Sequence, residues 1–160
     1  MAAYYARDLA DMVALGATDV LRLDDGTPAA VAVWCRSDLV GSALFAGEST
    51  AVVDPAVGQR LRLAMGAMAA GAPTEPHWYL DVLATAPDLR RQGLATAVLA
   101  PGLGRADADG LPAYLETADP ATVPFYQRQG FEVVGTTEVD GLPLWHMTRT
   151  PGGRPAEPLG

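Results

Sequence analysis

The residues from Thr85 to Thr96, TAPDLRRQGLAT, are the part of this sequence best suited to holding a ligand. An apolar run ends here in a short basic turn, and Gly93 stands where a helix is expected to begin. Backbone N–H groups and the macrodipole at a helix start favour anions, and Arg90 and Arg91 add full positive charges. A glycine lets the main chain approach a ligand closely. The segment therefore predicts a site for an anionic cofactor.

An ordinary surface turn is the competing interpretation of this segment, because many turns carry two arginines before a helix and bind nothing. The segment contains neither the GxxxxGK[ST] pattern of a nucleotide P-loop nor the GxGxxG pattern of dinucleotide-binding proteins. The motif taken alone leaves both interpretations open.

The elements around this segment alternate between strands and helices. Spacing predicts a helix carrying Tyr5, Leu9, Met12 and Val13 that ends at Gly16, and then two antiparallel strands over residues 20–34. The dipeptide Asp25-Gly26 suits the positive φ angles of a tight turn between these strands. A second helix is expected to begin with Asp54 as N-cap and Pro55 as first residue and to end at Gly71, with these residues on its core-facing side: Val57, Leu61, Met65 and Met68.

The second half of the chain continues the same alternation. The apolar run 78–84 predicts a central strand covered on both faces, and a helix over 93–109 is expected to be bent or divided at Pro101 and Gly102. Residues 113–117 predict a further strand. Asp119 and Pro120 then predict the start of a short helix that closes at Gly130, before a final strand pair over 131–134 and 144–147. This order describes an α/β fold with a mixed sheet.

Composition limits the function classes. A chain of 160 residues with 49% hydrophobic residues is expected to form one domain, 1–150, followed by a flexible tail, 151–160. The net charge of -8 disfavours nucleic acid as a partner and favours cationic small molecules. Because the two histidines lie far apart and no cysteine cluster accompanies them, we expect no metal site. The N-terminal residues suggest neither a signal peptide nor a membrane span, so we expect a cytoplasmic protein.

Two blocks of the sequence resemble the GNAT N-acetyltransferase superfamily. The family's cofactor loop commonly reads V-x-P-x-x-R/Q-x-x-G-x-G/A, and the matching residues here are Thr85, Pro87, Arg90, Gly93 and Ala95. Residues 121–135, ATVPFYQRQGFEVVG, are similar to the family's later block, with Thr122 at the position usually held by Asn. Within the superfamily the resemblance is strongest to the puromycin N-acetyltransferases, through segments that fall in order from Asp24 to Arg149: DDGTPAAVAVW, VLAPGL, PAYLET, VPFYQRQGF and WHMTR.

The resemblance implies the GNAT (acyl-CoA N-acyltransferase) fold, a mixed central sheet flanked by helices, with acetyl-CoA as the acyl donor. Family members usually begin with an additional strand and helix, so the chain is expected to be N-terminally shortened, completed by a partner, or directed at a different substrate. The exposed sheet edge that this leaves would favour a homodimer. The resemblance assigns the pantetheine arm to Leu83, Ala84 and Thr85, and the remaining cofactor contacts to Arg90, Arg91, Gln92, Gly93, Leu94, Ala95, Thr96 and Thr122.

The same resemblance suggests two catalytic side chains. Tyr126 matches the tyrosine that protonates the departing thiolate, although an aromatic core residue is the alternative. Glu116 could take a proton from the attacking ammonium, directly or through water, although a solvated or salt-bridged glutamate is equally common at a strand end. Asp81 is a second carboxylate in the same region. A covalent role for Cys35 is not required, because the amine attacks the thioester directly, and a small buried side chain is the expected role of this cysteine.

The function expected from these residues is transfer of an acetyl group from acetyl-CoA to the amine of a small molecule, such as an aminonucleoside-type or aminoglycoside-like antibiotic, and hence antibiotic resistance. Two alternatives remain. One is a GNAT-fold protein that binds an acyl-CoA or a partner without catalysing transfer, and the other is a GNAT-fold biosynthetic enzyme with different chemistry.

Overall fold

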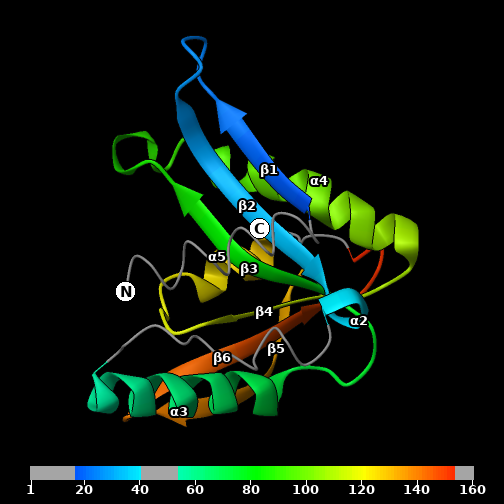
Figure 1. Cartoon of the computed structure of the whole chain (residues 1–160). Coiled ribbons are helices and arrows are strands. Elements are labelled where there is room, and N and C mark those ends of the chain that lie inside the picture. Colours follow the sequence, from blue (N-terminus) through cyan, green and yellow to red (C-terminus); the bar gives the residue numbers. More distant parts are fainter. Residues whose placement is uncertain (1–16, 41–53, 154–160) are drawn as a thin grey trace.

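A computed structural model describes residues 17–40 and 54–153 of the chain. They form a six-stranded mixed sheet in the order β1-β2-β3-β4-β6-β5, in which only β3 and β4 are parallel neighbours (Figure 1). The expected α/β class and mixed sheet are confirmed. The predicted first helix lies outside the described residues. The elements are β1 (Ala17–Arg22), β2 (Pro28–Arg36), α2 (Ser37–Val40), α3 (Pro55–Gly71), β3 (Trp78–Thr85), η2 (Pro87–Leu89), α4 (Leu94–Asp109), β4 (Ala113–Thr117), α5 (Val123–Arg128), β5 (Glu132–Val139) and β6 (Leu142–Arg149).

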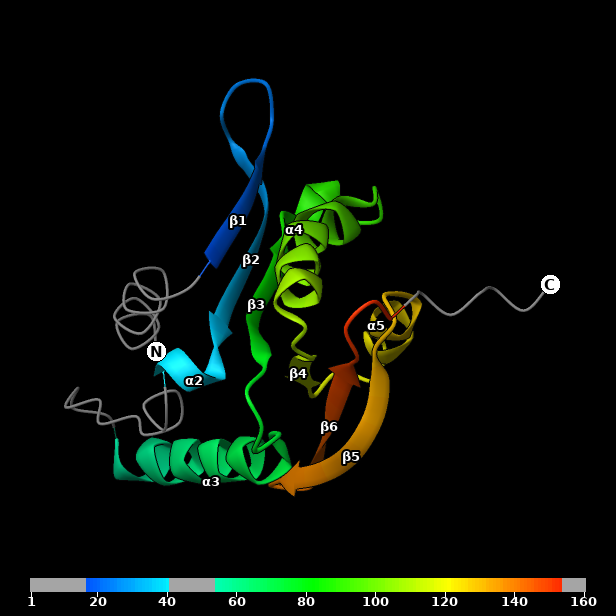
Figure 2. The same ribbon diagram turned by 90° about the vertical axis from the view of Figure 1, so that its right-hand side faces the viewer.

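The sheet separates two apolar clusters. The larger one joins α4 to one face of β2, β3, β4 and β6, and the partly buried α5 residues Val123, Phe125 and Tyr126 pack against it. Figure 2 shows α4 and α5 on this same side of the sheet. The smaller cluster, on the other face, contains Val33, Cys35, Tyr79 and Tyr114. Along β4 the side chains alternate between the two, so Leu115 belongs to the larger cluster and Tyr114 to the smaller one.

The hairpin between β1 and β2 is wider than the tight turn expected from Asp25-Gly26. Leu23 N–H donates to the Thr27 carbonyl at 2.9 Å, so five residues make the loop. Gly26 has the expected positive φ of 84°, but Asp25 does not. Instead, the Asp25 carboxylate accepts from Thr27 N–H at 2.8 Å, which closes the turn with a side chain.

Helix α3 begins as predicted, with the Asp54 carboxylate accepting from Ala56 N–H at 2.9 Å and Pro55 as the first residue. The prediction that its apolar stripe is core is wrong. Met65 and Met68 are only half-buried and Val57 is 45% exposed, because the helix packs across β5 and β6 at one end of the sheet. None of the helices within 17–40 and 54–153 is both long and apolar enough to cross a bilayer.

Helix α4 runs from Leu94 to Asp109 as a single element, so Pro101 does not divide it. Pro101 is exposed, and the residues on the opposite side are buried against the sheet: Val98, Leu99, Leu103 and Ala106. The stabilisation from burying these side chains is larger than the cost of the one backbone hydrogen bond that a proline removes. Gly110, in the left-handed region at φ 66°, ends the helix.

Helix α5 is shorter than predicted and begins at Val123 rather than at Pro120. Asp119 caps only a preceding turn, in which its carboxylate accepts from Ala121 N–H at 2.9 Å. The final strand pair turns at Asp140-Gly141, both of which have positive φ, and both strands are longer than expected. Beyond β6, Gly152 N–H donates to the Asp107 carboxylate at 2.7 Å, and residues 154–160 of the predicted tail lie outside the described part of the chain.

Candidate active site

The parallel strands β3 and β4 separate soon after they begin. Backbone pairing joins only Trp78 to Ala113 and Tyr79 to Tyr114, and no later pair follows among the described residues. Figure 1 shows the two strands together at one end and apart at the other. Within the described part of the chain, the edge of β3 that faces β4 therefore has no backbone partner along its second half, which includes the predicted residues Leu83, Ala84 and Thr85.

A β-bulge changes the direction of β3 at the same level. Val33 of β2 pairs with Val82 and the next residue, Trp34, pairs with Leu80, so Asp81 is the extra residue of the bulge. Bulges bend a strand, increase its twist and occur often beside active sites. Here the bulge lies where β3 turns away from β4, and the exposed Asp81 follows directly after the buried Leu80.

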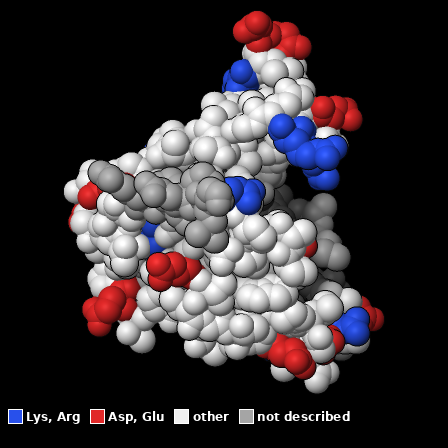
Figure 3. Space-filling view, turned by 180° about the vertical axis from the view of Figure 1, so that it is seen from behind, with Lys and Arg blue, Asp and Glu red and all other residues white. Residues whose placement is uncertain are grey.

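The predicted anion-binding turn follows the unpaired edge of β3. Residues Arg90, Arg91, Gln92 and Gly93 are all exposed, and Figure 3 shows the arginines of this turn as a basic patch on the projecting end of the molecule. Arg91 and Gly93 both have positive φ, 61° and 80°, which curls the main chain before α4.

The start of α4 has no side-chain cap. The first bond of the helix type is donated by Ala97 N–H to the Gly93 carbonyl at 3.0 Å, so the N–H groups of Leu94, Ala95 and Thr96 are not used within the helix. A Cβ built on Gly93 meets no atom of the described residues within 4 Å, so these residues leave the space beside Gly93 open. The arrangement fits a phosphate or pyrophosphate.

Helix α5 lies next to the first turn of α4, where Gln129 Nε2 donates to Thr96 Oγ1 at 3.3 Å. The Tyr126 ring packs edge-to-face on Phe125 and Phe131 with centroid distances of 5.1 and 6.0 Å. Its hydroxyl has no hydrogen-bond partner among the described residues, 17–40 and 54–153. Burial raises the pKa of Tyr126 to about 12. This phenol holds its proton at neutral pH.

Thr122 is fully engaged by its own neighbours. Its hydroxyl donates to the Asp119 carbonyl at 2.8 Å and lies 2.8 Å from Thr117 Oγ1, from which it accepts. These bonds connect the end of β4 to the start of α5. Thr122 thus positions Tyr126 relative to β4.

Glu116 lies on the opposite face of the sheet from Tyr126, beside the smaller apolar cluster. The Tyr79 hydroxyl donates to its Oε1, whereas Oε2 is buried and has no hydrogen-bond partner among the described residues. Burial is the main cause that raises the pKa of Glu116 to about 7, the charge of Asp81 raises it further, and the hydroxyls of Tyr79 and Tyr114 oppose the rise. A carboxyl with this pKa can exchange a proton near neutral pH.

The structure therefore divides the predicted site residues between two sides of the sheet. The basic turn, the start of α4 and Tyr126 lie on the α4 side, and Glu116 lies on the α3 side. The separation of β3 from β4 is the place where the two sides of the sheet can meet, because no backbone pair between these two described strands closes it beyond Tyr79 and Tyr114.

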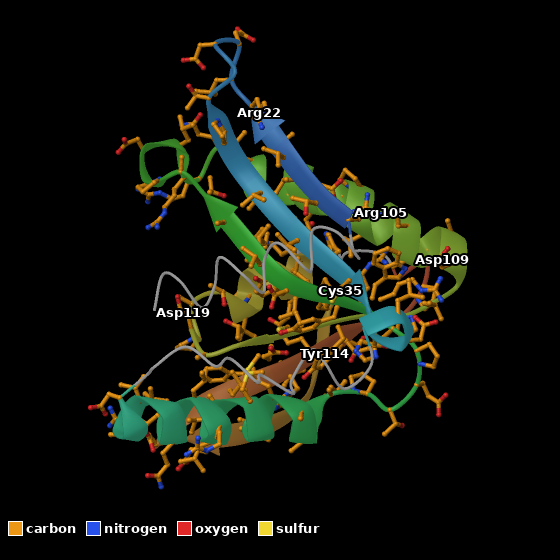
Figure 4. The ribbon with its side chains drawn as sticks, in the orientation of Figure 1. Arg22, Cys35, Arg105, Asp109, Tyr114 and Asp119 are labelled. Carbon is orange, nitrogen blue, oxygen red and sulfur yellow. The ribbon has the colours of Figure 1, made fainter. Side chains whose placement is uncertain are left out.

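Three aromatic residues at this site had no assigned role in the sequence. Tyr79 and Tyr114 stack with centroids 5.9 Å apart, and Tyr114 stacks on His146 at 6.1 Å. Figure 4 places Tyr114 near the middle of the sheet. The available signal was the two-residue spacing of Tyr114 and Glu116, which puts both on one face of a strand.

Cys35 lies on the same face but is a structural residue. It is fully buried, and burial, with the nearby carboxylates, raises the pKa of its thiol to about 12. The predicted role of a small buried side chain is confirmed. Among residues 17–40 and 54–153, no group of three or more His, Cys, Asp or Glu residues could hold a metal ion.

Comparison with known proteins relates this geometry to one family. The chain is similar to the histone acetyltransferase HPA2 and related acetyltransferase of Corynebacterium glutamicum, with 25% identity and a TM-score of 0.61 over 96% of this chain and 72% of that one. The fold is also shared with arylalkylamine N-acetyltransferase 2 of Aedes aegypti, at 13% identity and a TM-score of 0.69 over 90% and 77% of the two chains. Ribosomal-protein-S18-alanine N-acetyltransferase of Escherichia coli matches at 17% identity and a TM-score of 0.57 over 97% and 81%.

A family model covers most of the described residues. The model of the acetyltransferase (GNAT) family matches residues 17–131, from the start of β1 to the end of the turn after α5. This range includes the separated strands, the basic turn, Glu116 and Tyr126. The chain belongs to the acetyltransferase (GNAT) family.

Proposed function

We propose that this chain transfers the acetyl group of acetyl-CoA to the amine of a small molecule. The observation that carries this proposal is the continuous path formed by the unpaired edge of β3, the exposed arginine turn and the uncapped start of α4. An extended chain with amide groups can pair with the strand edge, and its phosphates can bind where the helix begins. CoA has both parts in that order.

The residues of the chain fit this donor without any nucleophile from the protein. Acetyl-CoA would supply a thioester that an amine can attack directly. Leu83, Ala84 and Thr85 would hold the pantetheine arm through their main chain, and Arg90 and Arg91 would add charge next to the phosphates. The buried Cys35 is unsuited to attack, because its thiol keeps its proton.

Glu116 and Tyr126 would move the protons. Oε2 of Glu116 is a buried acceptor without a donor among the described residues, and it would take the proton released by the amine. The Tyr126 hydroxyl would give its proton to the thiolate that departs, or hold it by a hydrogen bond. Since the two lie on opposite faces of the sheet, the amine would approach from the α3 side and the phosphates would bind on the α4 side.

A cationic amine is the acceptor that the chain's charge favours. The net charge of -8 steers positive molecules toward the protein, and the charge of Asp81 lies beside the separated strands. The segments similar to puromycin N-acetyltransferases support an aminonucleoside-type antibiotic as the first acceptor to test, and an aminoglycoside as the second.

Binding and transfer are tested separately. Acetyl-CoA at a hundredfold excess over its dissociation constant should stabilise the folded protein by about 2.7 kcal/mol, which is measured as a rise in melting temperature. Release of free CoA is then followed with puromycin, an aminoglycoside, an arylalkylamine and an alanine-terminated peptide. The absence of any thermal shift would contradict the proposal. A shift without CoA release from any amine would favour a protein that binds acyl-CoA without transferring the acyl group.

A further inference from the structure

Two tyrosines from neighbouring strands hold the side chain of Glu116. The Tyr79 hydroxyl of β3 donates to Glu116 Oε1, and the Tyr114 hydroxyl of β4 is also hydrogen-bonded to the Glu116 carboxyl. The two phenol rings stack with their centroids 5.9 Å apart and an interplanar angle of 29°. Both tyrosines are buried, so their hydroxyls meet the carboxyl where little water competes for it.

The two oxygens of the Glu116 carboxyl have different surroundings. Oε1 accepts from Tyr79, whereas Oε2 is buried and has no hydrogen-bond partner among residues 17–40 and 54–153. An ionised carboxylate has no proton to give, so each hydroxyl that bonds it must donate. A proton that Glu116 takes up is therefore expected on Oε2, the oxygen that no described donor occupies.

We infer that Tyr79 and Tyr114 are positioning residues for Glu116, because their hydroxyls stabilise the ionised carboxylate and leave Oε2 as the atom that accepts a proton. Burial and the charge of Asp81 both favour the neutral carboxyl. The two hydrogen bonds oppose them, because a donor to a carboxylate favours its charged form. Without the two hydroxyls, Glu116 would be largely protonated at neutral pH and could not act as a base.

His146 of β6 holds the Tyr114 ring in place. Its Nδ1 lies 2.6 Å from the Tyr114 hydroxyl, and the two rings stack at 6.1 Å with an interplanar angle of 8°. A hydroxyl has one proton and two lone pairs, so Tyr114 can bond both Glu116 and His146. A Cβ built on Gly71 of α3 would overlap the His146 ring, so the helix packs closely on the imidazole. These contacts fix the position of the Tyr114 hydroxyl in whichever direction its bond to His146 runs.

The other titratable groups around the Glu116 carboxyl come from each described element packed against it. Those that face Glu116 or the Tyr114 ring lie on β2, β3, β4 and β6 and on the residue before β3: Cys35, Tyr79, Asp81, Tyr114, His146 and His77. Of these groups, Asp81 contributes the charge that acts on Glu116, and it favours the neutral carboxyl. The inference rests on the proposed function in one respect, the use of Glu116 as the base.

The test is a direct titration of Glu116 in the full chain. The carboxyl carbon of glutamate is labelled with ¹³C, and the Glu116 signal is assigned by its loss in Glu116→Gln. Tyr79→Phe and Tyr114→Phe each remove one donor and keep the ring, so the pKa of Glu116 should rise from about 7 by about one unit in each. Tyr126→Phe is the matched control. Its hydroxyl lies on the other face of the sheet, so the pKa of Glu116 should not change in this variant.

The two tyrosine variants test the inference independently of each other. Tyr79→Phe leaves the contact between Tyr114 and His146 in place, so a rise in this variant cannot come from the imidazole. The inference is overturned if the pKa of Glu116 is unchanged or lower in both variants, or if it rises equally in Tyr126→Phe. A rise in one variant alone would overturn the positioning role of the other tyrosine.

Kinetics separate the inference from the proposed function. With Glu116 as base, a rise of one unit lowers kcat/KM at pH 7 by about fivefold relative to the wild type, because a smaller fraction of Glu116 is ionised. This loss, measured with the most reactive amine of the panel, should be recovered at pH 9, whereas a structural defect would persist at both pH values. Titration shifts without this change in the rate profile support the positioning role of the two tyrosines. In that case the proposed role of Glu116 as base is wrong.

Discussion

The Tyr79 hydroxyl donates to Oε1 of Glu116, and this bond crosses from β3 to β4 at the last point where the two strands are paired. Beyond it the strands separate, so Glu116 lies where the ladder ends. The bond satisfies one carboxyl oxygen and leaves the other to a group that the described residues do not supply. Its position makes Glu116 both a structural partner of Tyr79 and a candidate base.

Replacing Glu116 with Gln should make the protein more stable relative to the wild type as the pH rises from 4.5 to 7. The folded state holds the Glu116 proton up to about pH 7, whereas the unfolded chain releases it near 4.5. The folded state therefore binds more protons in this range, and the unfolding free energy of the wild type falls by up to about 1.4 kcal/mol per pH unit. Urea unfolding of both proteins across this range measures the effect.

Glu132→Gln is the matched control for that experiment, because Glu132 is exposed on β5 and the substitution removes the same charge. Parallel pH profiles for wild type and Glu116→Gln would mean that Glu116 is not perturbed by burial.

Gly102→Ala should destabilise the fold, whereas Gly104→Ala, one half-turn away in the same helix, should not. A Cβ on Gly102 would lie 2.1 Å from Trp34 Nε1, and Trp34 is fully buried in the larger cluster. Overpacking of this kind costs about 1–3 kcal/mol, or about 2–4 °C in Tm for each kcal/mol in a chain of this size. A Cβ on Gly104 meets nothing within 4 Å, and alanine is favoured over glycine in a helix by about 1 kcal/mol. Equal melting temperatures for the two variants would contradict the close contact between α4 and β2.

Replacing both Arg90 and Arg91 with Ala should weaken the binding of CoA by about a hundredfold or more, because hydrogen bonds to charged groups contribute at least about 1.5 kcal/mol each and 1.4 kcal/mol corresponds to a tenfold change in affinity. The affinity for dephospho-CoA, which lacks one phosphate, should fall by a smaller factor. Isothermal titration calorimetry with the two ligands measures the difference. Arg62→Ala is the control for net charge, since Arg62 is exposed on α3. If both ligands lose affinity equally, the arginines do not contact the phosphate that distinguishes them.

Cys35 should resist alkylation until the protein unfolds. The thiolate is the reactive form, and a pKa of about 12 together with complete burial keeps it scarce and inaccessible. Iodoacetamide labelling in native buffer should be at least about a thousandfold slower than in denaturant. Mass spectrometry reads the result directly, because this is the only cysteine of the chain. Rapid labelling of the native protein would show that β2 opens without global unfolding.

Local sequence patterns predicted most of the strands and helices of the fold correctly. The strand predicted over 113–117 and the helix predicted over 93–109 agree with β4 and α4, since apolar spacing and glycine ends act within a few residues. The same signal failed at Asp119-Pro120. Asp119-Pro120 has the same sequence as Asp54-Pro55, where a helix does begin. At Asp119 the chain forms a turn instead, with Thr122 N–H donating to the Asp119 carbonyl at 3.0 Å. A cap signature cannot tell a turn from a helix when a second proline, Pro124, follows closely.

The site was only partly predictable for a different reason. Arg90 was found from the basic turn before a helix, and Glu116 and Tyr126 from the resemblance to the family. His146 was not, because its connection to Glu116 depends on the antiparallel register of β4 and β6, which pairs residues far apart in the chain. Gly71 against His146 is a contact of the same kind. No local window of the sequence contains either relationship.

The short pairing of β3 with β4 also divides the sheet mechanically. Strands β1, β2 and β3 form one group and β4, β6 and β5 another, and only two residue pairs join their backbones. The angle between the groups therefore depends on side-chain contacts on both faces of the sheet. Trp34 and Leu80 meet Leu115 and Met147 on the α4 face, and Tyr79 stacks on Tyr114 on the other face. Two strands that are hydrogen-bonded along their whole length resist movement relative to each other. Strands β3 and β4 are paired at one end only, so the two groups of strands can rotate about that end. A molecule bound along the unpaired edge of β3 would restrict this motion between the two groups of strands.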